Sequence, residues 1–412
     1  MRTRASLGAA LLALALTACA SEEPAIPTKR EEETPAQRQA RLEGLARQAR
    51  AKLEGLRPEL KLGKLPPLEL WTEARYGEWL DERWGQTWGE AQARLEADLW
   101  AVLGLLPPEF PERQAAKERL TADTRVFFDQ VQGRLVVIGA SDPRLDELVH
   151  ELVHAQQRER PALLALSGRL EAAGLAAHDA TWTLQALLEG EALCLQGLAR
   201  GAPEKPVQLA QRTVAAMRWQ RGEPPALSYL FSEPYFFGVQ AIAVLHQQGE
   251  WKAVDRALAD PPLASRELFT LMRAGWDGPP ARDDPPRLPD LRELLGAEQV
   301  QDVQLGERVA QLVITQLSAT QLVTATQGFG PDLARVYRGG PLLGETVALV
   351  WGVTFRNEAE AVRYQNLLEA ARKFGRSPWP RAELLRRGRQ LWLLLGVPPS
   401  RREAAVERVL AR

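Results

Sequence analysis

Apolar residues recur with a helical period between positions 145 and 157. They form one stripe on an α-helix: Leu145, Leu148, Val149, Leu152 and Val153. Ser141 or Asp142 can cap the N-terminus of this helix, and Pro143 suits its first position, where a missing N–H costs little. The pattern predicts an amphipathic helix whose apolar face a core holds in place.

A second apolar periodicity predicts a buried helix from about residue 179. Its apolar positions are Leu184, Leu187, Leu188, Ala192 and Leu195. Gly190 lies inside this pattern, and a glycine weakens a helix unless something must approach its backbone closely. We therefore expect another element to pack against the helix at Gly190.

Residues 125–139 favour β-structure directly before the first helix. Apolar and β-branched residues flank Gln132 and Gly133, a pattern that predicts a β-hairpin with its turn at those two residues. Between residues 68 and 106 lie five of the twelve tryptophans, interleaved with leucines: Trp71, Trp79, Trp84, Trp88 and Trp100. They indicate mainly the core of a helical subdomain.

The C-terminal part of the chain predicts a separate small module. A segment rich in Pro and Asp, residues 260–289, suggests a boundary. Beyond it we predict a helix over 291–318, a strand over 347–355, a helix over 357–373 capped by Asn357, and one or two surface helices in the Arg-rich tail, 381–412. The chain thus divides into residues 36–280 and residues 290–412, in an α+β fold that is predominantly α-helical.

The N-terminus predicts export. Residues 1–18 carry two arginines, an apolar run and small residues, as in a signal peptide that is removed. The ending Leu16-Thr17-Ala18-Cys19 resembles a bacterial lipobox, which implies lipidation of Cys19; an ordinary secretory signal is the alternative. Residues 19–35 are rich in Glu, Pro and Thr and predict a flexible tether. We expect a protein of the bacterial cell envelope, anchored to an inner or outer membrane.

Charge and cysteine content exclude other classes. The chain has 52 basic and 53 acidic residues, which gives no support to nucleic-acid binding. It has two cysteines. If Cys19 is lipidated, Cys194 has no partner for an intramolecular disulfide, and its position on the second helix predicts a small buried residue.

The candidate chemistry lies on the first helix, in the sequence His-Glu-x-x-His. His150 and His154 are four residues apart, so both imidazoles project from one helix face and can bind one cation. Glu151 lies beside them, where a carboxylate can deprotonate a water molecule on zinc. The pattern predicts one Zn²⁺ per chain.

A catalytic zinc needs a third protein ligand. Glu189 and Glu191 flank Gly190 on the second predicted helix, and a buried carboxylate requires a cation, either a metal or an arginine. The residues alone leave open which of the two is the ligand. His178 is a further candidate, although it lies outside the pair of histidines four apart.

These motifs resemble those of the gluzincin metallopeptidases. His-Glu-Leu-Val-His-Ala followed by Ala-Leu-Leu-Glu-Gly-Glu-Ala is similar to a pattern in poorly characterised bacterial zinc-peptidase-like lipoproteins, and the similarity extends over most of the chain from about residue 125. It implies that Glu189 is the third ligand, while Glu191 and Asp179 support the ligands from behind. Gln157-Arg158 departs from the Gln-Asp usual at this point.

The resemblance also implies a zincin-like core and peptide hydrolysis. Glu151 would be the general base and later the proton donor, Tyr235 would donate a hydrogen bond to the oxyanion, and a peptide or protein substrate would add as a strand to a sheet edge at the hairpin. Two alternatives remain: a zinc-binding lipoprotein without turnover that acts in binding or assembly, and a zinc amidase or esterase with a non-peptide substrate. The oligomeric state is not predicted.

Overall fold

The computed structural model describes residues 33–60, 62–87, 89–107, 109–140, 142–201, 206–210, 224–278, 284–315, 326, 328–373 and 382–411. The predicted signal peptide, Cys19 and most of the predicted tether lie outside these residues. Within them, no helix is both long enough and apolar enough to cross a membrane.

The fold is α+β and mostly helical, as predicted. The N-terminal elements are α2 (Pro35–Leu56), β1 (Leu68–Trp71), α3 (Glu73–Thr87), α4 (Glu90–Val102), α5 (Glu112–Asp123), β2 (Val126–Asp129), β3 (Arg134–Ile138), α6 (Leu145–Arg158), α7 (Pro161–Ala173), η1 (Gly174–Ala177), α8 (His178–Ala199), α10 (Pro225–Phe231), α11 (Glu233–Ala259) and α12 (Ser265–Ala274).

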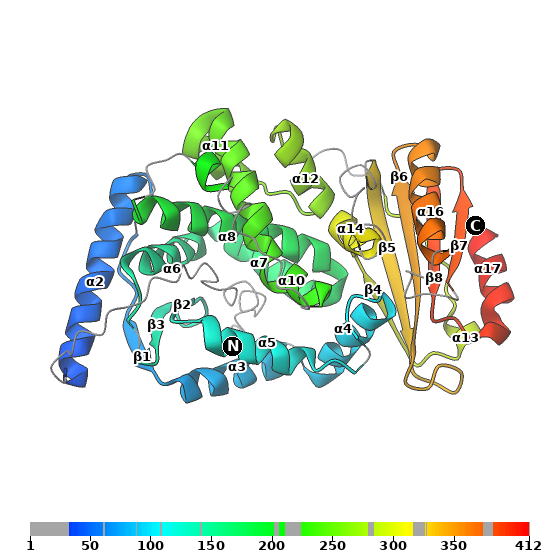
Figure 1. Cartoon of the computed structure of the whole chain (residues 1–412), viewed down its shortest axis with the longest axis horizontal. Helices are drawn as coiled ribbons and strands as arrows, with labels where there is room; N and C mark the ends of the chain where they lie inside the picture. The colour runs from blue at the N-terminus through cyan, green and yellow to red at the C-terminus, as the bar shows by residue number, and fades with distance from the viewer. Residues whose placement is uncertain are drawn as a thin grey trace.

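The C-terminal elements are α13 (Arg292–Leu295), β4 (Gln299–Val303), α14 (Gly306–Thr315), β5 (Phe329–Arg338), β6 (Val347–Phe355), α16 (Glu358–Lys373), β7 (Glu383–Arg387), β8 (Gln390–Leu395), η2 (Pro399–Arg401) and α17 (Arg402–Leu410). Helix α2 lies at one end of the elongated molecule, and the C-terminal sheet with α16 and α17 lies at the other (Figure 1).

A small sheet precedes the helix of the His-Glu-x-x-His motif. Strands β2 and β3 form the predicted antiparallel hairpin, and β1 adds to it in parallel with β3 in the order β1-β3-β2. The helical subdomain predicted over 68–106 contains helices α3 and α4, but its first residues form strand β1 instead. The tryptophans on α3 and α4 are buried as predicted: Trp79, Trp84 and Trp100. Trp88 lies outside the described residues.

Helix α6 begins later than the sequence predicted. Its first residue is Leu145, and the Glu147 carboxylate accepts a hydrogen bond of 2.8 Å from the Arg144 N–H. Asp142 is not the cap, because its carboxylate pairs with Arg41 instead, at 2.9 Å. Ser141 lies outside the described residues. A glutamate in the first turn thus satisfies a free backbone donor that the predicted cap would have served.

Helices α8 and α11 are in backbone contact where the glycine predicted it. A Cβ atom built on Gly190 would lie 2.3 Å from the carbonyl carbon of Gly238, and one on Gly238 would lie 1.8 Å from the Ala186 oxygen. Ordinary carbon contacts are about 3.5–4.0 Å. Only glycine therefore permits these two helices to pack at this distance.

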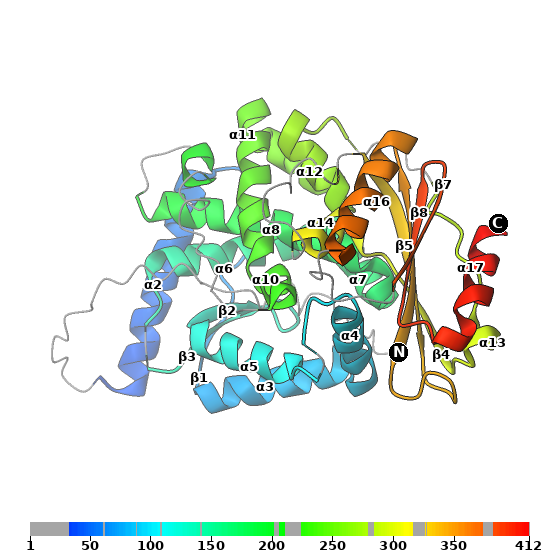
Figure 2. The ribbon, with the colours of Figure 1, turned by 45° about the vertical axis from the view of Figure 1, so that its right-hand side comes forward.

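The C-terminal part is a five-stranded antiparallel sheet in the order β4-β5-β6-β8-β7. Central strand β6 is buried along its whole length, because α16 covers one face of the sheet and α17 the other (Figure 2). The prediction of this strand was confirmed. Helix α16 is capped as predicted, since the Asn357 side chain accepts a hydrogen bond from the Glu360 N–H at 3.0 Å.

One C-terminal prediction was wrong, and another was only partly right. Residues 291–318 were predicted as one helix, but β4 separates α13 from α14 within the described part of that range. The tail from 381 contains the β7–β8 hairpin before its only described α-helix, α17. Leucine, arginine and glutamate in these strands favour helices, and pairing with neighbouring strands overrides that preference.

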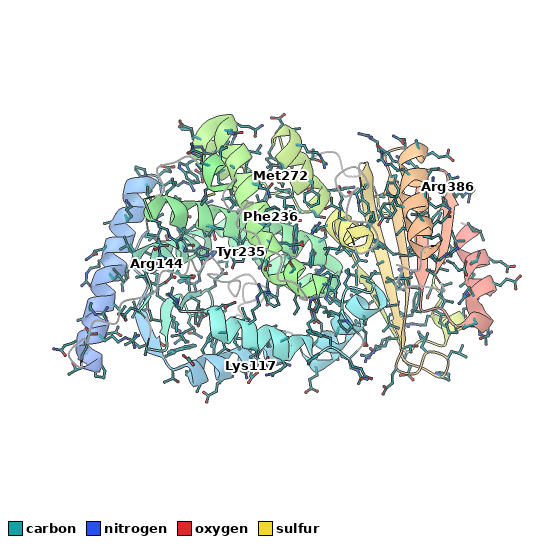
Figure 3. All side chains as sticks on the ribbon, in the orientation of Figure 1. Lys117, Arg144, Tyr235, Phe236, Met272 and Arg386 are labelled. Carbon is teal, nitrogen blue, oxygen red and sulfur yellow. The ribbon has the colours of Figure 1, made fainter. Side chains whose placement is uncertain are left out.

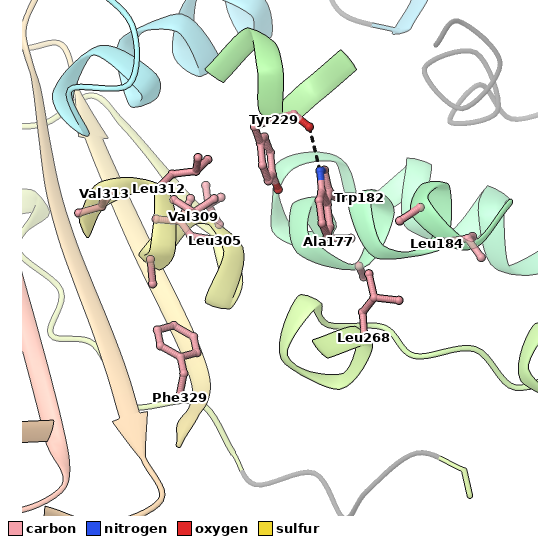
Figure 4. Packing of buried hydrophobic residues seen from close by; sticks show 14 of the residues in the cluster. Ala177, Trp182, Leu184, Tyr229, Leu268, Leu305, Val309, Leu312, Val313 and Phe329 are labelled. Carbon is pink, nitrogen blue, oxygen red and sulfur yellow. Dashed lines mark hydrogen bonds between the residues drawn. The ribbon is translucent and has the colours of Figure 1, made fainter. Parts of the chain in front are cut away.

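One hydrophobic cluster joins the helical part to the C-terminal sheet. It includes Leu184 of α8, Leu268 of α12, Val309 of α14 and Phe329 of β5 (Figure 4). Within it, the Trp182 indole N–H donates to the Tyr229 carbonyl oxygen at 2.9 Å, and the two rings are parallel to within 2°. The sheet and the helical part thus share one core, and the Asp179 N–H at the start of α8 donates to the Gln304 carbonyl oxygen, just after β4, at 3.1 Å.

Candidate metal centre

Three buried side chains from α6 and α8 meet at one point. The Nε2 atoms of His150 and His154 are 3.0 Å apart, one helical turn from each other along α6. An Oε2 atom of Glu189, on α8, lies 3.3 Å from the first and 3.4 Å from the second. In the described part of the chain this is the only group of three or more His, Cys, Asp or Glu side chains arranged to hold a metal ion.

The Glu189 carboxylate brings a buried negative charge to the centre. Both carboxylate oxygens of Glu189 are buried and make no hydrogen bond of normal geometry with the described residues. Burial opposes ionisation of Glu189, but the His154 and His150 imidazoles lower its pKa to about 2. Burial likewise opposes charge on His154, and Glu189 raises the pKa of that imidazole to about 9. A cation between the three groups would satisfy the buried carboxylate.

A chain of hydrogen bonds orients His154. Its Nδ1 lies 2.9 Å from the amide oxygen of Gln157, whose nitrogen donates to the Leu188 carbonyl at 3.0 Å and to Glu191 Oε2 at 2.9 Å. An amide oxygen only accepts, so Nδ1 of His154 carries a proton and Nε2 points its lone pair at the centre when the imidazole is neutral.

A matching chain orients His150. Its Nδ1 lies 3.1 Å from the amide oxygen of Gln196, and the Gln196 nitrogen donates to Asp146 at 3.4 Å. Arg200 holds the Asp146 carboxylate at 2.8 Å. Each histidine is therefore hydrogen-bonded to a glutamine, and each glutamine is hydrogen-bonded to a buried carboxylate. Such partners behind the ligands fix the tautomer and the ring orientation.

Glu191 binds Gln157, the residue that orients His154, and its carboxylate pairs with arginines instead of the histidines. Arg160 donates to its Oε1 at 3.1 Å, and Arg57, from the end of α2, forms a second buried ion pair with the same carboxylate. Burial opposes ionisation of Glu191, but Arg160 and Arg57 lower its pKa. Of the two acids that flank Gly190, one thus meets the histidines and the other meets arginines.

Glu151 is buried beside the cluster and is held from the sheet. Its Oε2 accepts a hydrogen bond of 2.7 Å from the Phe128 N–H of edge strand β2. Burial raises the pKa of Glu151, while the neighbouring His150 and His154 lower it. One carboxylate oxygen is therefore fixed to the backbone, and the other is free of that bond.

Tyr235 of α11 lies against the cluster. Figure 3 shows Tyr235 in the helical part of the molecule. Its ring stacks on the His150 imidazole, with centroids 6.5 Å apart and planes at 25°. Its hydroxyl is buried and has no hydrogen-bond partner among the described residues. Burial and the charges of Glu189 and Glu151 raise its pKa, so the phenol stays protonated and able to donate.

Asp179 does not support the metal ligands, contrary to the prediction. It lies ten residues before Glu189, about 15 Å along α8, and accepts a hydrogen bond from the Ser265 N–H at 2.9 Å. His178 is equally remote: its ring contacts Trp100, at 5.3 Å between centroids, and Tyr229. Cys194 is a buried free thiol, as predicted.

Asp146, Gln196 and Arg57 were not among the predicted site residues. A signal for the first two was present. Asp146 precedes His150 by four residues, and Gln196 follows Glu189 by seven, so each shares a helix face with a ligand. Arg57 gave no such signal, because its contact with Glu191 joins residues 134 positions apart.

Comparison with protein-family models, curated proteins and solved structures found no match for this chain.

Proposed function

We propose that this chain is a zinc-dependent metallopeptidase of the gluzincin type, with a zincin-like core. The observation that supports it most is that His150 and His154 converge on the buried Glu189 carboxylate, which makes no hydrogen bond of normal geometry with the described residues. Two imidazole nitrogens and one carboxylate oxygen are a ligand set typical of catalytic zinc, which keeps one position open. A bound Zn²⁺ would supply Lewis-acid polarisation of water and of the substrate carbonyl.

Glu151 and Tyr235 lie beside the three proposed zinc ligands, where a general base and an oxyanion donor are needed for hydrolysis. Glu151 takes the proton of the attacking water and later delivers it to the leaving amine. Its bond to the Phe128 N–H holds the carboxylate beside the cluster during both transfers. Tyr235, a protonated donor stacked on His150, stabilises the oxyanion.

Strand β2 supports a peptide as substrate. It is an edge strand of the small sheet. The Ile138 N–H of β3 donates to the Arg125 carbonyl oxygen. In an antiparallel pair, successive residues point their backbone groups alternately toward and away from the neighbouring strand, so this bond fixes which residues of β2 point toward β3. By that alternation the backbone groups of Val126 and Phe128 point outward, and the Phe128 N–H is taken by Glu151. The residues of β2 are only 1% exposed, so the strand has to be uncovered before a substrate binds. An extended peptide would then pair with the Val126 N–H and C=O and the Phe128 C=O.

The cellular location is part of the proposal and rests on the sequence. A lipid on Cys19 and the tether after it would anchor the domain at the bacterial cell envelope, since helix α2 begins at Pro35. No nucleic acid is expected as a partner.

The test begins with zinc content. The chain from Ala20 onward should hold about one zinc, and Glu189→Ala should lose it, because a direct ligand matters more than the roughly 10–100-fold effect of a supporting residue. Asp179→Asn, a buried acid on the same helix, is the matched control and should keep the zinc. A folded parent chain that takes up no zinc would refute the proposal.

Turnover is tested separately with Glu151→Gln. This variant should keep about one zinc and lose hydrolysis of a mixed peptide library followed by mass spectrometry. A parent chain that holds zinc yet cleaves ester or non-peptide amide substrates alone would identify an esterase or amidase. Retained zinc without turnover on any substrate would favour a binding lipoprotein.

A further inference from the structure

A cavity lies where the helical part meets the C-terminal sheet, beyond the Asp179 end of α8. It has a volume of about 310 Å³ and is lined by α12, α14, the first residues of β5, the end of β6 and the β7–β8 turn. The turn is tied to β6, since the Phe355 N–H donates to the Arg389 carbonyl at 2.8 Å. Small-ligand sites have volumes from about 300 Å³ upward.

Four arginines from three different segments line this cavity. Arg266 and Arg273 come from α12, Arg356 follows β6, and Arg389 lies in the β7–β8 turn. Arg356 pairs with Glu360. No carboxylate of the described residues forms an ion pair with Arg266, Arg273 or Arg389. Glu307 lies near both of the α12 arginines, and Asp179 and Asp332 lie near Arg266. The lining still has four arginines against two glutamates, Glu267 and Glu307. Like charges repel one another, and a bound anion would reduce that repulsion.

The acidic side chains of the cavity are already engaged. Glu267 accepts a hydrogen bond of 2.8 Å from the Leu263 N–H at the start of α12. Glu307 is buried and accepts from Thr326 at 2.8 Å. Burial raises the pKa of Glu307 to about 7, against the lowering effect of that hydrogen bond and of nearby Arg273, so this carboxyl is partly neutral near pH 7.

The wall of the cavity carries a free polar group. The Thr354 hydroxyl is buried, with 4% of the residue exposed, and it has no hydrogen-bond partner among the described residues. Gly328 and Gly330 line the same cavity without side chains. A Cβ atom on Gly328 would collide with the Glu360 side chain, and one on Gly330 would lie 2.3 Å from the backbone carbonyl oxygen of Thr354.

We propose that this cavity binds a small anion with two or more negative charges, of the phosphate or dicarboxylate class. Guanidinium groups are suited to these ligands because they donate paired hydrogen bonds to carboxylate and phosphate oxygens. The ligand would hold α12 to the β7–β8 turn and so brace the helical part against the sheet. The site is independent of the metal centre, since it shares no residue with it.

The test is calorimetric titration of the full chain with inorganic phosphate, succinate and, as a monovalent reference, acetate. We expect one phosphate or succinate per chain and weaker binding of acetate. Arg266→Ala and Arg389→Ala should each weaken binding by about tenfold or more, the value of a charged hydrogen bond. Repeating the titration in Glu189→Ala excludes an anion bound at the metal centre.

Arg292→Ala is the matched control, because exposed Arg292 on α13 lies near the far end of β5. It should bind the anion like the parent chain. Arg266→Lys and Arg389→Lys keep the charge and test whether loss of binding reflects misfolding. Equal binding by the parent and all alanine variants, or no binding of either divalent anion, would overturn the proposal. A preference for phosphate or for succinate identifies the ligand class.

Discussion

The Gly190→Ala substitution tests whether close packing of α8 on α11 positions the third ligand. Glu189 immediately precedes this glycine, and the added Cβ would lie 2.3 Å from the carbonyl carbon of Gly238. An ordinary contact is about 3.5 Å or more, so the two backbones must separate by about 1 Å or shift along each other. Either movement displaces Glu189 relative to the histidines of α6.

Two opposing effects determine the magnitude. Alanine is a better helix former than glycine, which stabilises the fold by about 1 kcal/mol. Overpacking of a core costs about 1–3 kcal/mol and sometimes more, and here the obstacle is backbone, which gives way less readily than a side chain. We therefore expect net destabilisation of about 1–2 kcal/mol, together with weaker zinc binding.

The assay is urea denaturation of the metal-free chain, beside zinc affinity by chelator competition. Gly44→Ala on α2 is the matched control, because its Cβ would meet only the tip of the Arg47 side chain, at 3.8 Å. The control should gain up to about 1 kcal/mol from helix propensity alone and keep its zinc affinity. If Gly190→Ala were as stable as Gly44→Ala and bound zinc like the parent chain, the reasoning would be refuted.

Two more predictions concern the surroundings of the site. Gln157→Leu and Gln196→Leu should each lower zinc affinity about 10–100-fold, because each removes the acceptor of a ligand imidazole. Gln365→Ala, at a half-buried glutamine on α16, should leave zinc affinity unchanged. Unchanged affinity in both leucine variants would show that the amides play no orienting role. His178 keeps its Nε2 buried without a partner, and burial lowers its pKa to about 4. In the unfolded chain this histidine has a pKa near 6.5 and binds a proton that the buried side chain does not bind in the folded chain. The free energy of unfolding should therefore fall as the pH decreases from about 6.5 to 4, by about 3 kcal/mol in total from this residue. Urea midpoints at pH 7 and 4.5 should therefore differ less in His178→Phe than in the parent chain, and an equal difference would count against this origin.

The sequence predicted those parts of the site that depend on local periodicity. Helical spacing placed His150 and His154 on one face, and Gly190 marked the contact with another helix. The choice of Glu189 over Glu191 followed from a family resemblance, and the structure brings Glu189 to the histidines. The hairpin, β6 and α16 were predictable for the same reason, since each has a clear local pattern.

The failures share a dependence on distant parts of the chain. Strand β1 exists because it pairs with β3, more than sixty residues later, through register Leu68 to Leu135. Strand β7 has helix-forming residues and is held by β8. Asp179 looked like a supporting residue because it shares a helix with Glu189, but its partner, Ser265, follows 86 positions later. The local propensity of a segment gives no information about which distant segment it will pair with.

The contact of Arg57 with Glu191 also bears on the order of folding. It joins residues 134 positions apart, and the contact of Arg57 with Asp255 spans 198. Contacts between distant residues form late, because closing long loops costs entropy before the contact repays it. The support of His154 is complete only after α2, α6, α8 and α11 have docked. During refolding, recovery of metal binding should therefore lag behind recovery of helix content, and a chain still lacking α11 has no finished site.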